Sequence, residues 1–136
     1  MINVIYGKKG MGKTKILVEN ANNFAEQSSG DVVFIDDSNQ LMYDLKRKIR
    51  FINVADFPVE GSTAFLGFLC GMISQDYDID GVFIDGLTYI VKERTENLKE
   101  FFTGLKKLAS KYNVTFNISI NGDNEEMPEF LKEFIA

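Results

Sequence analysis

The chain of 136 residues contains no histidine, no tryptophan, one cysteine and two prolines. Without histidine there is no imidazole to act as a general base or metal ligand, which excludes Ser-His-Asp triads and histidine-ligated metals. The single cysteine, Cys70, excludes an intramolecular disulfide and a zinc site built from several cysteines. Such a low cysteine content is typical of a protein from a reducing compartment, so we expect a cytoplasmic location.

Long apolar segments and an excess of basic residues are missing as well. The longest apolar stretch, residues 64–73, is far shorter than the roughly 18 residues that indicate a membrane span, so we predict none. The formal charge is −5, and an acidic chain lacks the cationic field that coating nucleic acid requires. One basic cluster, Lys46–Arg50, stands out. We expect a solvated helix end there, with contact to nucleic acid or an acidic partner as the alternative.

The composition is that of one folded domain, which we assign to residues 1–136. Hydrophobic residues make up 45% of the chain and charged residues 26%, the balance of a globular protein. At this length a chain buries about two-thirds of its unfolded surface, which is enough for a core.

Apolar runs and helical periodicities alternate along the chain. Runs typical of buried strands lie at residues 2–6, 32–35, 51–54, 81–84 and 114–120. Helical spacing predicts helices at residues 13–26, 61–75 and 95–112, another that follows Asn39 and carries Leu41, Leu45 and Ile49 on one face, and a short closing helix from Pro128. Alternation of this kind requires crossover connections. We therefore predict a three-layer α/β fold, with a mostly parallel sheet of about five strands and helices on both faces.

The strongest motif follows the first predicted strand and fits the pattern G-x-x-x-x-G-K-[ST] in full. Glycines in this pattern let backbone N–H groups converge on phosphate oxygens, and the next helix presents its positive end to them. Lys13 would reach the β- and γ-phosphates of ATP, and the hydroxyl of Thr14 would coordinate Mg²⁺. We predict that the nucleotide contacts Gly7, Lys8, Lys9, Gly10, Met11, Gly12, Lys13, Thr14 and Lys15.

Acidic residues end two of the predicted strands. Asp85 ends the strand at 81–84, where open α/β sheets bind ligands, and we expect it to hold Mg²⁺ with Thr14. A cap for the following turn is the alternative. Asp36 and Asp37 end the strand at 32–35 and would orient or polarise the attacking water in phosphoryl transfer. Capping of the next helix is the alternative for this pair.

Other families with this phosphate-binding motif match the chain poorly. A GTPase carries N-K-x-D and D-x-x-G motifs, whereas Asp85 is followed by Gly86-Leu87-Thr88. A small-molecule kinase has an arginine-rich lid, yet the only arginines are Arg47, Arg50 and Arg94. Lys8 matches the extra lysine of ParA/MinD-type ATPases, but Lys9 stands where those proteins have glycine, and their chains are much longer.

The chain resembles the RecA/DnaB/KaiC-type ATPases over roughly residues 1–121. Besides the phosphate-binding motif, residues 30–36 are similar to their second strand, 80–88 to their Walker B strand, and 105–115 to the passage that leads to their γ-phosphate sensor. The resemblance implies a RecA-like core, with Asp85 as the Walker B acid and Asn121 at the sensor position.

The chain also departs from this family. The family places a catalytic glutamate just beyond the second strand, where this chain has Asp36, Asp37 and Ser38, and its later strands, which supply arginine fingers and nucleic-acid loops, have no counterpart. We therefore expect a Mg²⁺-dependent ATP-binding protein that is a small, slow ATPase or an ATP-dependent switch. Its catalytic residues would be Lys13, Asp36 and Asp37. The alternative is a catalytically weak or inactive module that acts through a protein partner or as a homo-oligomer.

Overall fold

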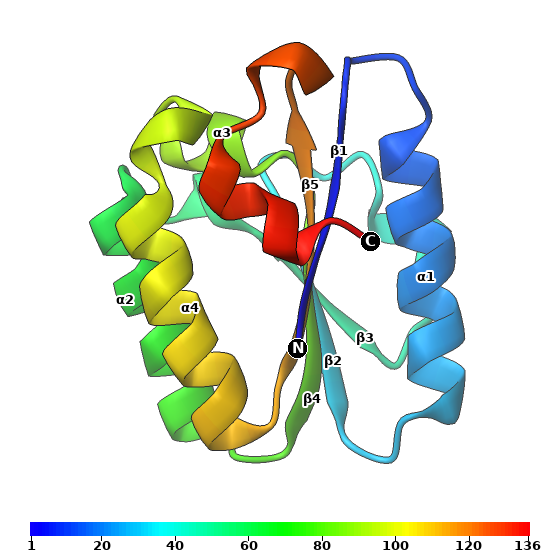
Figure 1. Ribbon diagram of the computed structural model, residues 1–136. Helices are drawn as coiled ribbons and strands as arrows, with labels where there is room; N and C mark the ends of the chain where they lie inside the picture. The colour runs from blue at the N-terminus through cyan, green and yellow to red at the C-terminus, as the bar shows by residue number, and fades with distance from the viewer.

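A computed structural model describes all 136 residues as an α/β fold around one five-stranded sheet (Figure 1). The strand order is β1-β5-β4-β2-β3, and every neighbouring pair is parallel, which confirms the predicted fold class. The strands are β1 (Ile2–Gly7), β2 (Asp31–Asp36), β3 (Ile49–Asn53), β4 (Ile79–Ile84) and β5 (Thr115–Asn121).

Helices cover both faces of the sheet, but unequally. The helix α1 (Lys13–Gln27) lies on one face, while α2 (Ser62–Gln75) and α4 (Lys99–Tyr112) lie on the other (Figure 1). The second face also carries the short α3 (Leu87–Val91) and a closing 3₁₀ helix, Glu129–Phe134. No helix in the structure has the length and apolar character needed to cross a membrane.

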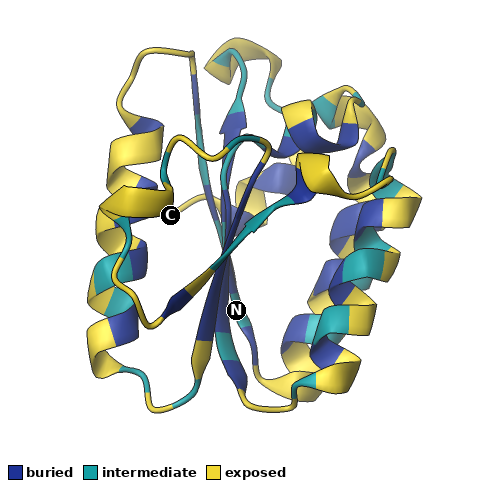
Figure 2. Cartoon of the chain, turned by 180° about the vertical axis from the view of Figure 1, so that it is seen from behind, coloured by how far each residue is buried: buried dark blue, intermediate teal, exposed yellow.

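Both faces of the sheet are buried, which explains the uninterrupted apolar runs at residues 32–35 of β2 and 82–84 of β4. In β2, Val33 and Ile35 belong to the larger apolar cluster under α2 and α4, whereas Val32 and Phe34 belong to the smaller cluster under α1. Figure 2 shows this as a band of buried residues along the strands. The Phe34 ring stacks on that of Phe83, with 6.4 Å between the centroids.

The prediction of a helix after Asn39 is wrong. The structure has only a 3₁₀ turn, Met42–Asp44, and β3 begins at Ile49, where the basic cluster was expected to end a helix. The Asn22 side chain, on α1, donates to the carbonyl of Asp44 and accepts from the N–H of Lys46, so these backbone groups bond to α1 rather than within a helix of their own. Pairing of β3 with β2 then overrides the weak periodicity of the leucines. The closing helix is confirmed, although it is of the 3₁₀ type.

Gly81, in β4, shows how closely α1 packs on the sheet. A Cβ atom at Gly81 would lie 2.6 Å from the Phe24 ring, whereas one at Gly71, on the exposed side of α2, would meet nothing within 4 Å. Gly81→Ala should lower the free energy of unfolding by about 1–3 kcal/mol through overpacking. Gly71→Ala should raise it by about 0.5–1 kcal/mol, because alanine favours the helix. Urea denaturation of both variants measures this, and equal effects would contradict the packing shown here.

Candidate functional site

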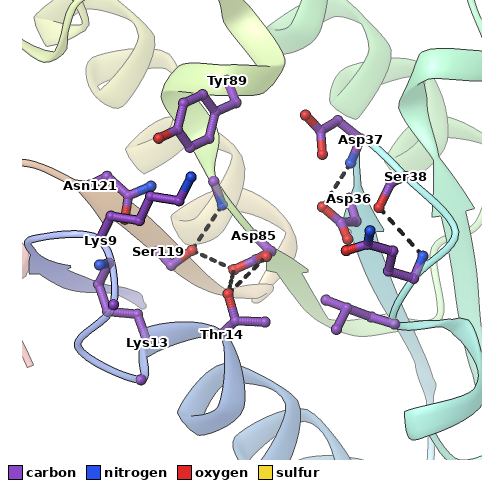
Figure 3. Close-up of a pocket in the computed structure, with 15 residues that line it drawn as sticks. Lys9, Lys13, Thr14, Asp36, Asp37, Ser38, Asp85, Tyr89, Ser119 and Asn121 are labelled. Carbon is purple, nitrogen blue, oxygen red and sulfur yellow. Dashed lines mark hydrogen bonds between the residues drawn. The ribbon is translucent and has the colours of Figure 1, made fainter.

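A cavity of about 620 Å³ opens at the carboxyl ends of the strands. This is the edge at which open α/β sheets bind ligands. The cavity is lined by Lys9, Gly10, Gly12, Lys13, Thr14, Asp36, Asp37, Ser38, Gln40, Leu41, Asp85, Gly86, Tyr89, Ser119 and Asn121 (Figure 3).

The loop between β1 and α1 forms one wall of this cavity. Gly10 and Gly12 have φ angles of 90° and 78°, in the left-handed region where a side chain would be strained, so the loop shape depends on glycine. The Lys13 side chain is only 7% exposed, and its Nζ donates to the carbonyl oxygen of Lys8 at 2.6 Å. Burial lowers the pKa of Lys13, while the Asp85 charge opposes this shift. The ammonium group is thus folded back onto its own loop, and a bound anion would compete with the Lys8 carbonyl for it.

No side chain accepts a hydrogen bond from the N–H groups at the N-terminus of α1. Its N-cap is Gly12, no side chain caps it, and its first turn holds no acidic residue. Free N–H groups and the helix dipole leave a partial positive charge at this end, beside Lys13. The loop and the helix together therefore offer an anion both backbone donors and one buried cation.

Asp85 connects three elements of the fold at the cavity floor (Figure 3). Its backbone N–H donates to the carbonyl of Ile35 in β2 at 3.0 Å. Its carboxylate accepts from the Thr14 hydroxyl of α1 at 3.1 and 3.2 Å, and from the Ser119 hydroxyl of β5 at 2.7 Å. The acid at this strand end therefore has a fixed position rather than a solvated one.

Thr14 and Asp85 are suitable ligands for a hard cation. Both side chains offer oxygen ligands. The chain has no group of three or more His, Cys, Asp or Glu residues that could hold a metal ion through protein ligands alone. A cation here would have two protein oxygens and would complete its shell with water or ligand oxygens. Mg²⁺ is commonly bound in this way, whereas Ca²⁺ and Zn²⁺ rely on more protein ligands.

Asp36 and Asp37 line the opposite wall, in different environments. Asp36 is 5% exposed and accepts a hydrogen bond from the N–H of Asp37 at 2.8 Å, while Asp37 is exposed. The pKa of Asp36 is raised to about 7, mainly by burial. The hydrogen bond from the Asp37 N–H opposes this rise, and the nearby carboxylates of Asp85 and Asp37 add to it. Near neutral pH, Asp36 is therefore divided between its protonated and charged forms, and it can accept or release a proton there.

The structure brings most of the predicted residues together. Nine of them line the cavity: Lys9, Gly10, Gly12, Lys13, Thr14, Asp36, Asp37, Asp85 and Asn121. Four predicted nucleotide contacts, Gly7, Lys8, Met11 and Lys15, are not among the lining residues, although the Lys8 carbonyl holds Lys13. Sequence reasoning missed six lining residues: Ser38, Gln40, Leu41, Gly86, Tyr89 and Ser119.

Ser119 is the most informative of the missed residues. It is 3% exposed and lies between Ile118 and Ile120, near the end of β5. A polar side chain at a buried strand position two residues before Asn121, hence on the same face of β5, was a signal that could have found it.

The basic cluster lies at the start of β3, away from the carboxyl ends of the strands, and three of its four charged side chains, all except Arg47, interact with neighbouring groups. Lys46 pairs with Glu26, and Lys48 donates to the carbonyl of Ser28 at 3.3 Å. The charge of Arg50 acts on the carboxyls of Asp31 and Asp76. The pKa of Asp76 is lowered mainly by its interaction with Asp31, and the charge of Arg50 adds to this. No arginine lines the cavity.

Comparison with known proteins adds no family assignment. No protein-family model matches the chain, and no curated protein matches it significantly. The chemistry of the site therefore has to be argued from its own geometry.

The raised pKa of Asp36 predicts a pH dependence of stability. An acid whose pKa is higher in the folded than in the unfolded chain loses stability as pH rises from its unfolded value through the folded value. Between pH 5 and 8, the free energy of unfolding of the wild type should therefore fall more steeply than that of Asp36→Asn, whose amide stays neutral. Urea denaturation across this range tests it. Parallel pH profiles would show that Asp36 does not titrate there.

Proposed function

We propose that the protein binds ATP together with Mg²⁺ and acts as a small, slow ATPase or an ATP-dependent switch. The observation that carries this proposal is the convergence of three features in one cavity. They are the buried Lys13, the uncapped N-terminus of α1, and the Thr14–Asp85 pair. Together they supply a cation, backbone donors and hard oxygen ligands, the combination needed by a triphosphate with its divalent ion.

The charges of the cavity favour a ligand that brings a metal ion with it. Two lysines face three aspartates across the cavity, so a triphosphate alone would meet more negative than positive charge. When bound, Mg²⁺ would screen the phosphates from Asp85. Thr14 and Asp85 would hold the ion, Lys13 would leave the Lys8 carbonyl for phosphate oxygens, and the loop glycines would admit the phosphates close to the backbone.

The sheet order brings Asn121 to the same cavity. The strand β5, which ends in Asn121, lies between β1 and β4, so Asn121 reaches the cavity between the loop and Asp85. Its amide can donate to a phosphate oxygen. On this basis we assign Asn121 to contact the terminal phosphate.

Hydrolysis requires a water that is oriented for attack on the γ-phosphate. Asp36 and Asp37 line the cavity wall facing the loop, and the proposed role of Asp37 is to orient this water. Aspartate is one methylene shorter than the glutamate of the similar family. A misplacement of about 1 Å costs on the order of 100-fold in rate, so we expect slow chemistry.

One observation favours a second candidate function, a nucleotide-binding module that acts through a protein partner or as a homo-oligomer. No arginine lines the cavity, so charge that develops on the transferred phosphoryl group has only lysines to stabilise it. A partner that supplies an arginine would raise the rate by roughly 10³–10⁵, as arginine fingers do. We place the protein in the cytoplasm, because a single cysteine is typical of a reducing compartment.

Replacing Lys13 tests nucleotide binding. Lys13→Ala should weaken ATP affinity about 10- to 100-fold, because it removes the buried cation and its charge-assisted hydrogen bonds. Lys107→Ala, on the exposed side of α4, removes the same charge away from the cavity and serves as the control. Calorimetric titration with ATP and Mg²⁺ measures both. Unchanged affinity in a folded Lys13→Ala protein would refute the phosphate-binding role of the loop.

Turnover by the isolated protein tests catalysis. We expect phosphate release well below the usual enzyme range of roughly 1–10³ per second, and a further decrease in Asp37→Asn. Release of inorganic phosphate under saturating ATP and Mg²⁺ measures both rates. Turnover of several per second that survives both Asp36→Asn and Asp37→Asn would contradict the assignment. Binding of ATP without any release would favour the module.

A further inference from the structure

The Ser119 hydroxyl makes two hydrogen bonds in opposite directions (Figure 3). It donates to Oδ1 of Asp85 at 2.7 Å and accepts from the backbone N–H of Gly86 at 2.8 Å. A hydroxyl carries one proton, so the single donation of Ser119 goes to the carboxylate. Ser119 is buried, and β5, the strand that carries it, pairs with β1 on one side and β4 on the other.

We propose that Ser119 is a positioning residue that orients the Asp85 carboxylate for the Mg²⁺ ion. The inference rests on the proposed function and deepens it, since it names the residue on which the metal ligand depends. Ser119 acts through Asp85.

Thr14 cannot take this role alone. Its contacts with the carboxylate are longer, 3.1 and 3.2 Å, and it belongs to an exposed position at the start of α1. Thr14 is also a proposed ligand of the same ion, so its oxygen has to serve the metal. Ser119 is therefore the donor to Asp85 that is not itself a proposed ligand of the ion. Partners of this kind set the orientation of metal ligands, and their loss typically costs 10–100-fold in metal affinity.

The second bond of Ser119 fixes the chain directly after Asp85. Gly86 has a φ angle of 70°, a left-handed conformation that turns the backbone from β4 into α3. The N–H of Gly86 is held by the same hydroxyl that holds the carboxylate. Ser119 therefore sets both the direction of the Asp85 side chain and the direction in which the chain leaves β4.

The test is the Mg²⁺ dependence of ATP binding in Ser119→Ala. The Mg²⁺ concentration at half-maximal ATP binding, measured by calorimetry, should rise about 10-fold, while ATP binding without Mg²⁺ should stay as in the wild type. Asn117→Ala is the matched control. Asn117 lies two residues earlier on the same face of β5, and its side chain accepts from Asn3 rather than contacting Asp85. Alanine fits the space of serine, and circular dichroism verifies that both variants fold.

A double-mutant cycle separates positioning from general loosening of the site. If Ser119 acts through Asp85, Ser119→Ala should have no further effect on the Mg²⁺ dependence in an Asp85→Asn background. An unshifted Ser119→Ala, an equal shift in Asn117→Ala, or the same shift in both Asp85 backgrounds would each overturn the positioning role while ATP binding stands. A wild type that does not bind ATP, or a Lys13→Ala variant that binds like the wild type, would overturn the proposed function itself and this inference with it.

Discussion

The parallel direction of all five strands is the constraint on which the site depends. Parallel pairing sends the carboxyl end of every strand to one edge of the sheet. Strand pairing therefore brings residues that are distant in the sequence close together there. Gly7 at the end of β1 pairs with Asn121 of β5, and Ile84 of β4 pairs with both Ile118 and Ile35. The residue that follows each of these strand ends is therefore placed by the register of the sheet. The cores on the two faces of the sheet fix that register, because a slip of a strand by one residue would exchange the side chains packed under α1 with those packed under α2 and α4.

The same convergence creates an electrostatic cost. Three carboxyl groups share a cavity with two lysines, and the most buried of them, Asp36, responds with a pKa of about 7. Burial is the main cause, and the charges of Asp85 and Asp37 add to it. A cation at Asp85 would remove part of this repulsion and favour the charged form of Asp36. Binding of a metal ion would therefore favour release of the proton from Asp36, because the ion offsets the negative charge that disfavours this release.

The sequence predicted those parts of the fold and site that local chemistry determines. The glycine positions, Lys13, Thr14 and the acids after two buried strands follow from a motif and from apolar runs, and the structure places them in one cavity. The prediction of a helix after Asn39 was wrong because it rested on leucine spacing alone. The backbone of this segment instead forms hydrogen bonds with Asn22, which lies on a different element. Ser119 and Tyr89 were missed for a related reason. The polar position of Ser119 in a buried strand was visible in the sequence, but its contact with Asp85 depends on the insertion of β5 between β1 and β4. Tyr89 lines the cavity because α3 directly follows the end of β4.

The two walls of the cavity differ in how firmly they are held, and this difference bears on what the site does well. Asp85 and Thr14 are fixed by strand pairing, by the Ser119 bond of 2.7 Å and by the start of a 15-residue helix. The wall beyond Asp37 depends on longer side-chain bonds, such as Ser38 with the N–H of Gln40 at 3.4 Å and Asn53 with Asn39 at 3.3 Å. The proposed binding of phosphate and metal would need only the first wall, whereas the proposed water in line with the γ-phosphate would need an acid held on the second. A chain that fixes its anion and cation groups but leaves Asp37, the acid proposed to orient the water, on a loosely bonded turn would favour binding over turnover in the proposed function. A partner that orders the second wall would therefore change the rate of the chemistry more than the affinity for the nucleotide.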